Sequence, residues 1–277
     1  MSKVAAIQMT SGPNIQANLD EAAKLIEQAA SQGAELIVLP ENFSQMPTNE
    51  RERVNNAEAD GEGHVQNFLS TQAKKHKAWI VGGTIPIKSE EGDRAYASSL
   101  VFNSEGERVA RYDKIHLFDV LIEENNETYN ESATTVPGNR VVVIDTPFGR
   151  LGLSVCYDLR FPELFRNMID EGMEICVLPA AFTAFTGQSH WEPLVRARAI
   201  ENQCYIIAAA QGGYHLNNRQ TYGHSMVVNP WGNVLGSVGT GPGVVITDIE
   251  KSVLNTTRKN FRVLHHRRLN CGISKAG

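Results

Sequence analysis

Two segments of the chain repeat the pattern of a strand, a helix and a second strand, and this repeat constrains the fold more than any other feature. In the first segment, the apolar residues 4–9 are followed by a helical pattern and by the run ELIVLPENF at 35–43. In the second, residues 150–158 are followed by an amphipathic stretch that starts at Pro162 and by the run EICVLPAAF at 174–182. Continuous apolar runs are typical of parallel strands buried on both faces. The repeat therefore predicts an internally duplicated α/β fold.

Further periodic segments extend both copies. Because strands that are apolar on both faces need cover on both sides, the pattern favours a single domain, residues 1–277, with two sheets and helices outside them. The polar stretch 123–132 is expected to be a loop, and a C-terminal tail is expected from about residue 262. We expect helices over 17–31, 64–77 and 188–203, strands over 78–87 and 205–211, and hairpins over 98–112 and 224–238.

The composition is that of an ordinary globular protein: 42% of the residues are hydrophobic, and 26 Lys and Arg against 31 Asp and Glu give a net charge of −5. A chain of this size buries a core without disulfides, and the four cysteines form no CxxC pair, so we expect a cytoplasmic protein. The first residues show no secretory leader and no apolar run spans a membrane, so we expect no membrane partner. The one basic cluster, at 265–268, is typical of a solvated tail, and we expect no nucleic-acid partner.

An acid follows the first repeated apolar run. Glu41 comes directly after LIVLP, whereas the equivalent position of the second copy is Ala180. The shared fold therefore does not itself require an acid there. The C-terminal end of a buried parallel strand is where α/β sheets carry ligand-handling groups. Glu41 is a candidate for such a group, and the alternative is a capping or surface acid.

Cys156 ends the first strand of the second copy and precedes a polar turn and a helix. Cys176 and Cys204 lie inside apolar runs, where a cysteine usually acts as a small buried hydrophobe, and Cys271 lies in the tail. Only Cys156 has a position suited to a nucleophile. That role requires a neighbouring base and a positive charge, and without them Cys156 is a packing residue.

A lysine and a histidine follow the second strand of the first predicted hairpin. Lys114 leads into the alternating residues 115–118, so it is either a surface lysine or the first residue of a cleft-facing set. His116 shares the face of Lys114 and offers a rival base for a papain-like Cys/His pair. If Lys114 faces a cleft, His116 can line the same pocket without contacting the thiol.

The motifs LPENF with Glu41, YDKIHLFD with Lys114 and VCYDLRFPE with Cys156, in this order and spacing, resemble the Glu-Lys-Cys triad of the nitrilase superfamily of carbon-nitrogen hydrolases. The resemblance extends over nearly the whole chain, through 186–211 and 222–232. It implies a four-layer α-β-β-α sandwich with two central sheets and internal pseudo-symmetry, in agreement with the two-sheet interpretation above.

The resemblance also implies a second glutamate that holds the lysine, and Glu131 in YNESATTVPG matches it. The chain departs from relatives before this motif, where LIEENNET replaces a turn that often contains glycine. The sequence therefore does not specify the conformation of this loop at the edge of the pocket. The implied chemistry is amide hydrolysis without a metal or an organic cofactor. Cys156 attacks, Glu41 transfers protons, and Lys114 with the backbone N–H of Tyr157 stabilises the oxyanion. A thioester forms on the cysteine and ammonia leaves.

Among the branches of this superfamily, the chain most resembles the one that hydrolyses deaminated glutathione, a small carboxylate-bearing amide. The alternatives are an ω-amidase acting on α-ketoglutaramate, a nitrilase or N-carbamoyl amidohydrolase with the same triad, and a non-enzymatic scaffold. Arg160 is a candidate for binding the substrate carboxylate, or it pairs with Asp158 or Glu163. The family implies a homodimer or a higher homo-oligomer. Phe182, Thr183 and Trp191 either line the pocket or pack in the core.

Overall fold

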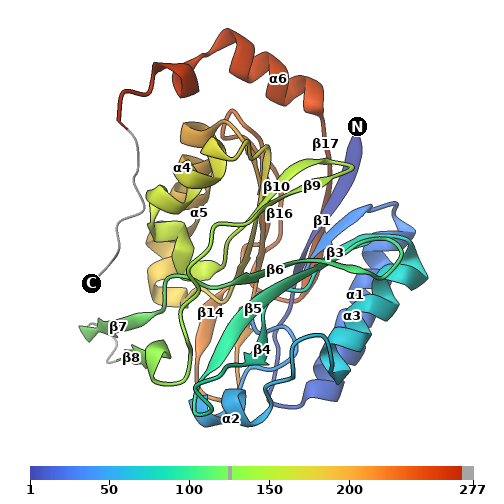
Figure 1. Ribbon diagram of the computed structural model, residues 1–277, viewed down its shortest axis with the longest axis vertical. Helices are drawn as coiled ribbons and strands as arrows, with labels where there is room; N and C mark the ends of the chain where they lie inside the picture. The colour runs from blue at the N-terminus through green and yellow to red at the C-terminus, as the bar shows by residue number, and fades with distance from the viewer. Residues whose placement is uncertain (124–126, 270–277) are drawn as a thin grey trace.

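Two sheets lie face to face at the centre of the molecule, and helices cover the outer side of each (Figure 1). The computed structural model describes residues 1–123 and 127–269. The first sheet contains, in spatial order, β17 (Gly243–Ile249), β1 (Ser2–Gln8), β2 (Leu36–Val38), β3 (Trp79–Val81), β5 (Ala95–Phe102) and β4 (Ile85–Lys88), with β6 (Arg108–Asp113) also paired to β5. The second contains β16 (Val234–Ser237), β15 (Met226–Val228), β12 (Tyr205–Ala210), β11 (Ile175–Ala180), β10 (Gly149–Leu153) and β9 (Val143–Thr146).

The helices complete a four-layer α-β-β-α sandwich, which confirms the predicted architecture. None of the helices in the described parts of the chain is long and apolar enough to cross a membrane. Helices α1 (Ile15–Ser31) and α3 (His64–His76) cover the first sheet, and α4 (Pro162–Asp170) and α5 (Ala184–Asn202) cover the second, while α6 (Lys251–Asn260) crosses one end (Figure 1).

The sequence repeat is visible in the strand pairing. The unit β1-α1-β2 pairs its two strands in parallel with Val4 opposite Leu36, and the unit β10-α4-β11 does the same with Leu151 opposite Ile175. Each unit then extends by a further parallel strand, β3 or β12. The predicted pseudo-symmetry therefore places the ends of equivalent strands at corresponding positions in the two sheets.

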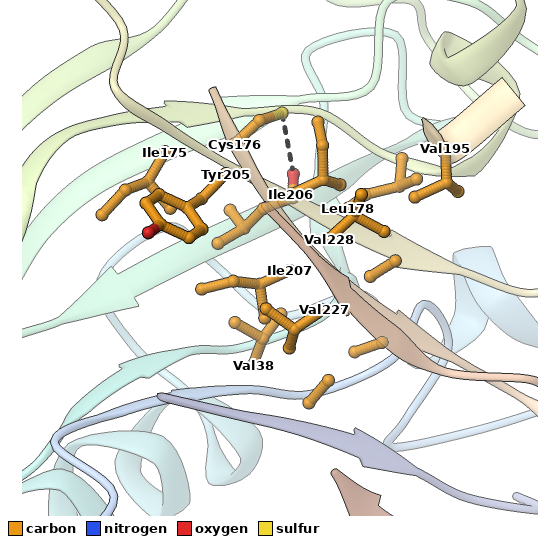
Figure 2. Close-up of a cluster of buried hydrophobic side chains, with 14 of the residues drawn as sticks. Val38, Ile175, Cys176, Leu178, Val195, Tyr205, Ile206, Ile207, Val227 and Val228 are labelled. Atoms are coloured by element: carbon orange, nitrogen blue, oxygen red, sulfur yellow. Dashed lines mark hydrogen bonds between the residues drawn. The ribbon is translucent and has the colours of Figure 1, made fainter. Parts of the chain in front are cut away.

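The main core lies between the two sheets. Val38 of the first sheet faces Ile207 and Val227 of the second, and all three are fully buried (Figure 2). Burying an aliphatic side chain of this size contributes about 1.5–3 kcal/mol, so this double-sided packing fixes how the sheets sit against each other. A second core forms where α1 presents an apolar stripe to the outer face of the first sheet, through Leu19, Ala22, Leu25, Ile26 and Ala29.

The structure corrects the predicted elements in two places. The strand expected over 78–87 is divided at its glycine pair into β3 and β4, because Gly83 has a φ of +51° and passes against the Pro40 carbonyl. The stretch 123–132, expected to be a loop, contributes β8 (Glu127–Asn130), which pairs with β7 (Asp119–Ile122). Residues 124–126 of that stretch lie outside the described residues.

Three further elements carry no strong sequence pattern. A short helix, α2 (Glu50–Asn55), follows the end of the first copy, and the hairpin of β13 (Gly212–Tyr214) and β14 (Gln220–Tyr222) follows β12. Both border the cavity described below. Beyond α6, residues 263–266 form a 3-10 helix in the segment expected to be a tail, and Arg267 pairs with Asp170.

Candidate active site

A buried lysine lies between two carboxylates where the first sheet ends. Lys114 follows β6, and its side chain is 2% exposed. Its Nζ donates to Glu41 Oε1 at 2.9 Å and to the two oxygens of Glu131 at 3.0 and 2.8 Å. Glu131 Oε2 also accepts a hydrogen bond from the Phe118 amide at 2.7 Å. The ammonium group is therefore held in a fixed direction, with Glu131 as its anchor, as the sequence motif implied.

Glu41 connects the two halves of the repeat. It follows β2, at a turn where Asn42 has a φ of +56°, and its Oε2 accepts a hydrogen bond from the Ala181 amide at 2.8 Å. Ala181 is the residue of the second copy that is equivalent to Asn42. Gln211, at the end of β12, donates to the Glu41 carbonyl at 3.0 Å. The carboxylate is thus oriented by the strand ends of the second sheet.

Cys156 begins a 3-10 helix, Cys156–Arg160, immediately after β10. Its φ of +46° is in the left-handed region, which costs a non-glycine residue about 1–2 kcal/mol and must be maintained by surrounding contacts. Asp158 supplies these contacts. Its carboxylate accepts hydrogen bonds from the Val155 amide at 2.8 Å, the Tyr112 hydroxyl at 2.7 Å and the His116 amide at 3.1 Å. The turn that carries the thiol is therefore tied to the strand that leads to the lysine.

Burial and charge set the protonation of the three groups. Burial raises the pKa of Glu41, but the charge of Lys114, a hydrogen bond from Lys114 and the charge of Arg219 together lower it further, so the pKa of this carboxyl lies below its ordinary value. Burial lowers the pKa of Lys114, but Glu131 and Glu41 raise it well above the ordinary value. Burial and the charge of Glu41 raise the pKa of the Cys156 thiol, and Lys114 opposes them only in part. The resting site therefore combines a carboxylate, an ammonium and a neutral thiol.

A cleft with about 630 Å³ of space free of protein atoms, including the part open to solvent, contains all three groups. This size suits a small-molecule ligand. Besides Glu41, Lys114, Glu131 and Cys156, its walls are formed by Asn42, Glu50, Arg53, Phe118, Thr128, Tyr129, Asn130, Tyr157, Arg160, Ala181, Phe182, Thr183, Thr186 and Arg219.

Arg160 lines the cleft beside the nucleophile. Its guanidinium lies over the ring of Phe182, 4.9 Å from the centroid, and one nitrogen is 3.1 Å from His190 Nδ1. Within residues 1–123 and 127–269 it forms no ion pair with Asp158, Glu163 or any other carboxylate. Burial lowers the pKa of Arg160, as expected for a cation without a carboxylate partner.

Two further arginines of the cleft were not identified from the sequence. Arg219, from the β13–β14 hairpin, donates to the Ala181 carbonyl at 2.7 Å and lies over the Tyr129 ring. Arg53, from α2, lies 3.6 Å from Glu131 and 3.4 Å from Glu50. Neither arginine belongs to a periodic segment. Arg219 begins the stretch RQTYGHSMVVNPWG, which carries part of the family resemblance, and for Arg53 the available signal is a basic residue in a polar stretch.

Of Phe182, Thr183 and Trp191, which the sequence places either in the pocket wall or in the core, two line the cleft and one does not. Phe182 and Thr183 are part of the cleft wall. Trp191 does not border it, which corrects that expectation: its ring is fully buried behind Phe182, 5.3 Å between centroids, and its indole N–H donates to the His224 carbonyl at 2.8 Å. α5 turns this face towards the core because an apolar surface of this size is more stable away from water.

His116 also lies outside the cleft wall. Its Nδ1 is 2.7 Å from Asp158 Oδ1, and its ring stacks on Phe161 with 3.7 Å between centroids. The rival interpretation, a papain-like histidine base, thus has no geometric support, since His116 supports the turn from behind. In the described parts of the chain, no group of three or more His, Cys, Asp or Glu side chains has the arrangement of a metal site.

Comparisons with known proteins agree with this geometry. Residues 3–259 match the carbon-nitrogen hydrolase family. The deaminated glutathione amidase of Synechocystis sp. is 45% identical over 266 residues, which cover 95% of this chain and 97% of that protein. The NitFhit protein of C. elegans has a TM-score of 0.89 at 38% identity; the match covers 96% of this chain but only 65% of that longer one.

A third relative is similar in fold and carries a modified cysteine. The amidase of Nesterenkonia sp. AN1, from the nitrilase superfamily, has a TM-score of 0.80 at 26% identity, with 96% of this chain and 99% of that chain covered, and has been solved after Michael addition of acrylamide at its active-site cysteine. The present chain belongs to the carbon-nitrogen hydrolase family. It is a hydrolase that acts on carbon-nitrogen bonds of amides.

Proposed function

We propose that the protein is a cysteine-dependent amidase whose substrate is deaminated glutathione, and that Cys156, Glu41 and Lys114 carry out the reaction. The observation that carries this proposal is the position of Lys114 Nζ, 2.9 Å from Glu41 and in the same cleft as the thiol. The similarity to the deaminated glutathione amidase of Synechocystis supports this choice of substrate. The acrylamide adduct of the Nesterenkonia amidase supports a cysteine nucleophile.

The first half of the reaction forms a thioester. Glu41 is ionised, because its pKa is held below its ordinary value, so it accepts the proton of the Cys156 thiol as the sulfur attacks the amide carbon. The carbonyl oxygen becomes an oxyanion beside the Lys114 ammonium. The backbone N–H of Tyr157, the residue after the nucleophile, is the second proposed donor. Glu41 then delivers the proton to the amine, and the carbon-nitrogen bond breaks.

The second half hydrolyses the thioester. Glu41, again a carboxylate, removes a proton from a water molecule, and the resulting hydroxide attacks the thioester carbon. The carbon-sulfur bond breaks, the thiolate recovers a proton from Glu41, and a carboxylic acid leaves. Glu131 takes no part in the proton transfers; it is a positioning residue that holds the ammonium of Lys114 through both of its oxygens.

The leaving group depends on the substrate. A primary amide such as α-ketoglutaramate releases ammonia, the product expected from the sequence. In deaminated glutathione the same amide joins a 2-oxoglutarate unit to cysteinylglycine, so the amine that leaves is the dipeptide. Of the predicted binding residues, Arg160 is suited to the 2-oxo acid carboxylate because it is a cation of the cleft wall that pairs with no carboxylate of the described residues. Phe182 and Thr183 complete the wall beside it.

A panel of substrates tests the proposed function. The purified enzyme is assayed with deaminated glutathione, α-ketoglutaramate, a short aliphatic nitrile and an N-carbamoyl amino acid, and the values of kcat/KM are compared. We expect deaminated glutathione to have the highest value, with 2-oxoglutarate and cysteinylglycine formed in equal amounts. A preference for α-ketoglutaramate would show an ω-amidase. Preferential cleavage of the nitrile, or release of carbon dioxide from the N-carbamoyl substrate, would overturn the proposal.

We also propose that the protein forms a homodimer. The exposed side chains of Ile200, Trp231 and Phe261 gather where the end of α5, the β15–β16 turn and the end of α6 meet, with 5.7 Å between the rings of Trp231 and Phe261. Gly232 in the turn lies against Ile200, so the three residues form one patch. Exposed apolar surface of this kind supports a protein interface. Sedimentation of wild type and of Trp231→Glu tests it: a monomeric wild type would contradict the proposal.

Two further proposals concern the whole chain. A single domain over 1–277, ending in a tail from about residue 262, is supported by cores that each draw on residues distant in sequence. A cytoplasmic location is supported by the free thiols of Cys156, Cys176 and Cys204, since an oxidising compartment favours paired cysteines. Cell fractionation tests the location.

A further inference from the structure

Two arginines of the cleft have no carboxylate partner among residues 1–123 and 127–269. Arg53 is different, because it lies near both Glu50 and Glu131. In the described parts of the chain, the guanidinium of Arg160 contacts His190 Nδ1, and that of Arg219 donates to the Ala181 carbonyl. In addition, Nε of Arg219 is buried and has no hydrogen-bond partner in the described structure. A guanidinium with an unused buried donor is suited to bind an anion, because hydrogen bonds between charged groups are the strong ones.

Arg219 lies on the side of the cleft occupied by Glu41. It donates to the carbonyl of Ala181 at 2.7 Å, and the amide of the same Ala181 donates to Glu41 Oε2 at 2.8 Å. One peptide segment therefore connects the arginine to the carboxylate. The positive charge of Arg219 also contributes to the low pKa of Glu41, in addition to the larger effect of Lys114.

Arg160 lies on the side of the nucleophile. It belongs to the same 3-10 helix as Cys156, and its guanidinium is 5.9 Å from the ring centroid of Tyr157, the residue after the thiol. Burial lowers the pKa of Arg160, and a thiolate at Cys156 would favour the charged form of this guanidinium. Arg219 therefore lies on the side of Glu41, and Arg160 lies on the side of Cys156.

The proposed reaction places different parts of the substrate near Arg160 and Arg219. The acyl part of the substrate stays bonded to the sulfur, so a carboxylate on the acyl part is near Arg160. The amine receives its proton from Glu41, so it departs next to that carboxylate. Groups carried by the amine therefore extend towards Arg219.

We propose that Arg219 binds a carboxylate carried by the leaving amine and thereby selects substrates that have a negative charge on both sides of the scissile amide. This inference rests on the proposed function. In deaminated glutathione the group is the carboxylate of the terminal glycine, two residues from the scissile bond and so about 7 Å away when extended. α-Ketoglutaramate has no such group, which makes Arg219 a specificity-determining residue for the larger substrate. A guanidinium suits this task because it binds both carboxylate oxygens at once.

A cycle of one enzyme variant and one substrate variant tests the inference. Wild type and Arg219→Gln are each assayed with deaminated glutathione and with its glycinamide analogue, which lacks the terminal negative charge, by following 2-oxoglutarate. In wild type we expect kcat/KM to fall by about 10- to 150-fold from the acid to the amide, the range typical of a lost hydrogen bond to a charged group. In Arg219→Gln we expect the kcat/KM values of the two substrates to agree within about threefold.

Controls separate the possible failures. Arg219→Lys keeps the charge and is expected to recover part of the preference for the acid, and thermal unfolding of each variant verifies that it is folded. If Arg219→Gln lowers kcat/KM for both substrates by the same factor, Arg219 acts through Glu41 alone. The inference is then wrong while the proposed function stands. If wild type hydrolyses α-ketoglutaramate but neither glutathione derivative, the proposed substrate itself is wrong.

Discussion

The hydroxyl of Tyr112 donates a hydrogen bond to Asp158 Oδ2 at 2.7 Å, and both side chains are fully buried. This bond joins β6, which leads to Lys114, to the turn that starts at Cys156. Tyr112 belongs to the first sheet, and Asp158 belongs to the 3-10 helix that follows β10 of the second sheet. Their contact therefore connects the segment that leads to the ammonium with the segment that carries the thiol.

Removing this hydroxyl should weaken both the fold and the reaction. In Tyr112→Phe, Asp158 loses one partner for a buried charge, which costs about 2 kcal/mol of unfolding free energy. We expect kcat to fall while KM changes little, because the turn of Cys156 loses its support. Urea denaturation and steady-state kinetics measure the two effects.

Tyr205→Phe is the matched control, because the Tyr205 hydroxyl bonds to backbone groups of Glu250 outside the cleft. It should lower stability and leave kcat unchanged. Equal losses of kcat in both variants would contradict a positioning role for Tyr112.

Neutralising the anchor of the lysine should change the pH profile. In Glu131→Gln, the negative charge that raises the pKa of Lys114 most is lost, so this pKa falls relative to wild type. We expect kcat to drop by about 10²-fold, as for a misplaced oxyanion donor, and the alkaline limb of the pH–rate profile to move to lower pH. Glu192→Gln, on the surface of α5, is the control. An alkaline limb that stays in place would argue against the charge of Glu131 as the cause.

Alkylation should distinguish the cysteines. In a Cys271→Ser background, iodoacetamide should label Cys156, which borders the cleft, and not Cys176 or Cys204, which are fully buried. Because the pKa of the Cys156 thiol is raised, the labelling rate should increase with pH above neutrality. Peptide mass spectrometry identifies the modified residue, and labelling of Cys176 at a similar rate would contradict the structure.

The buried thiol of Cys176 should make stability decrease in alkali. Burial raises its pKa to about 12, whereas an unfolded thiol ionises near pH 9.0. Between these values the native state binds more protons than the unfolded state, so stability is complete below pH 9 and decreases by about 1.4 kcal/mol per pH unit above it. Cys176→Ala should remove the part of this pH dependence of stability that the Cys176 thiol contributes. Urea midpoints between pH 8.5 and 11 test this, and an unchanged slope would contradict it.

The sequence could place the reactive residues because they end strands. The parallel repeat predicts that Glu41 and Cys156 lie at strand ends. The alternation after Lys114 predicts a face shared with His116, but His116 lies outside the cleft wall, against Asp158 and Phe161. Packing decided the rest. The sequence leaves Trp191 open between the pocket wall and the core because the helical pattern does not say which face of α5 meets the core, and the structure places its ring behind Phe182.

The arginines illustrate a different limit. Arg219 reaches the cleft from a hairpin whose strands have three residues each, too short for a periodic signal. Arg160 was found because it adjoins the nucleophile in sequence. The polar stretch before Glu131 was interpreted as a loop because its composition is that of one, yet part of it pairs as β8.

The hydrogen bond from Ala181 to Glu41 has a consequence for the newly made chain. The acid belongs to one repeat, and the amide that orients it belongs to the other, so neither half can assemble a working site by itself. A chain whose halves have not yet docked presents a sulfur without its proton acceptor. Amidase activity therefore requires the completely folded chain, and incompletely folded chains do not hydrolyse the amides around them.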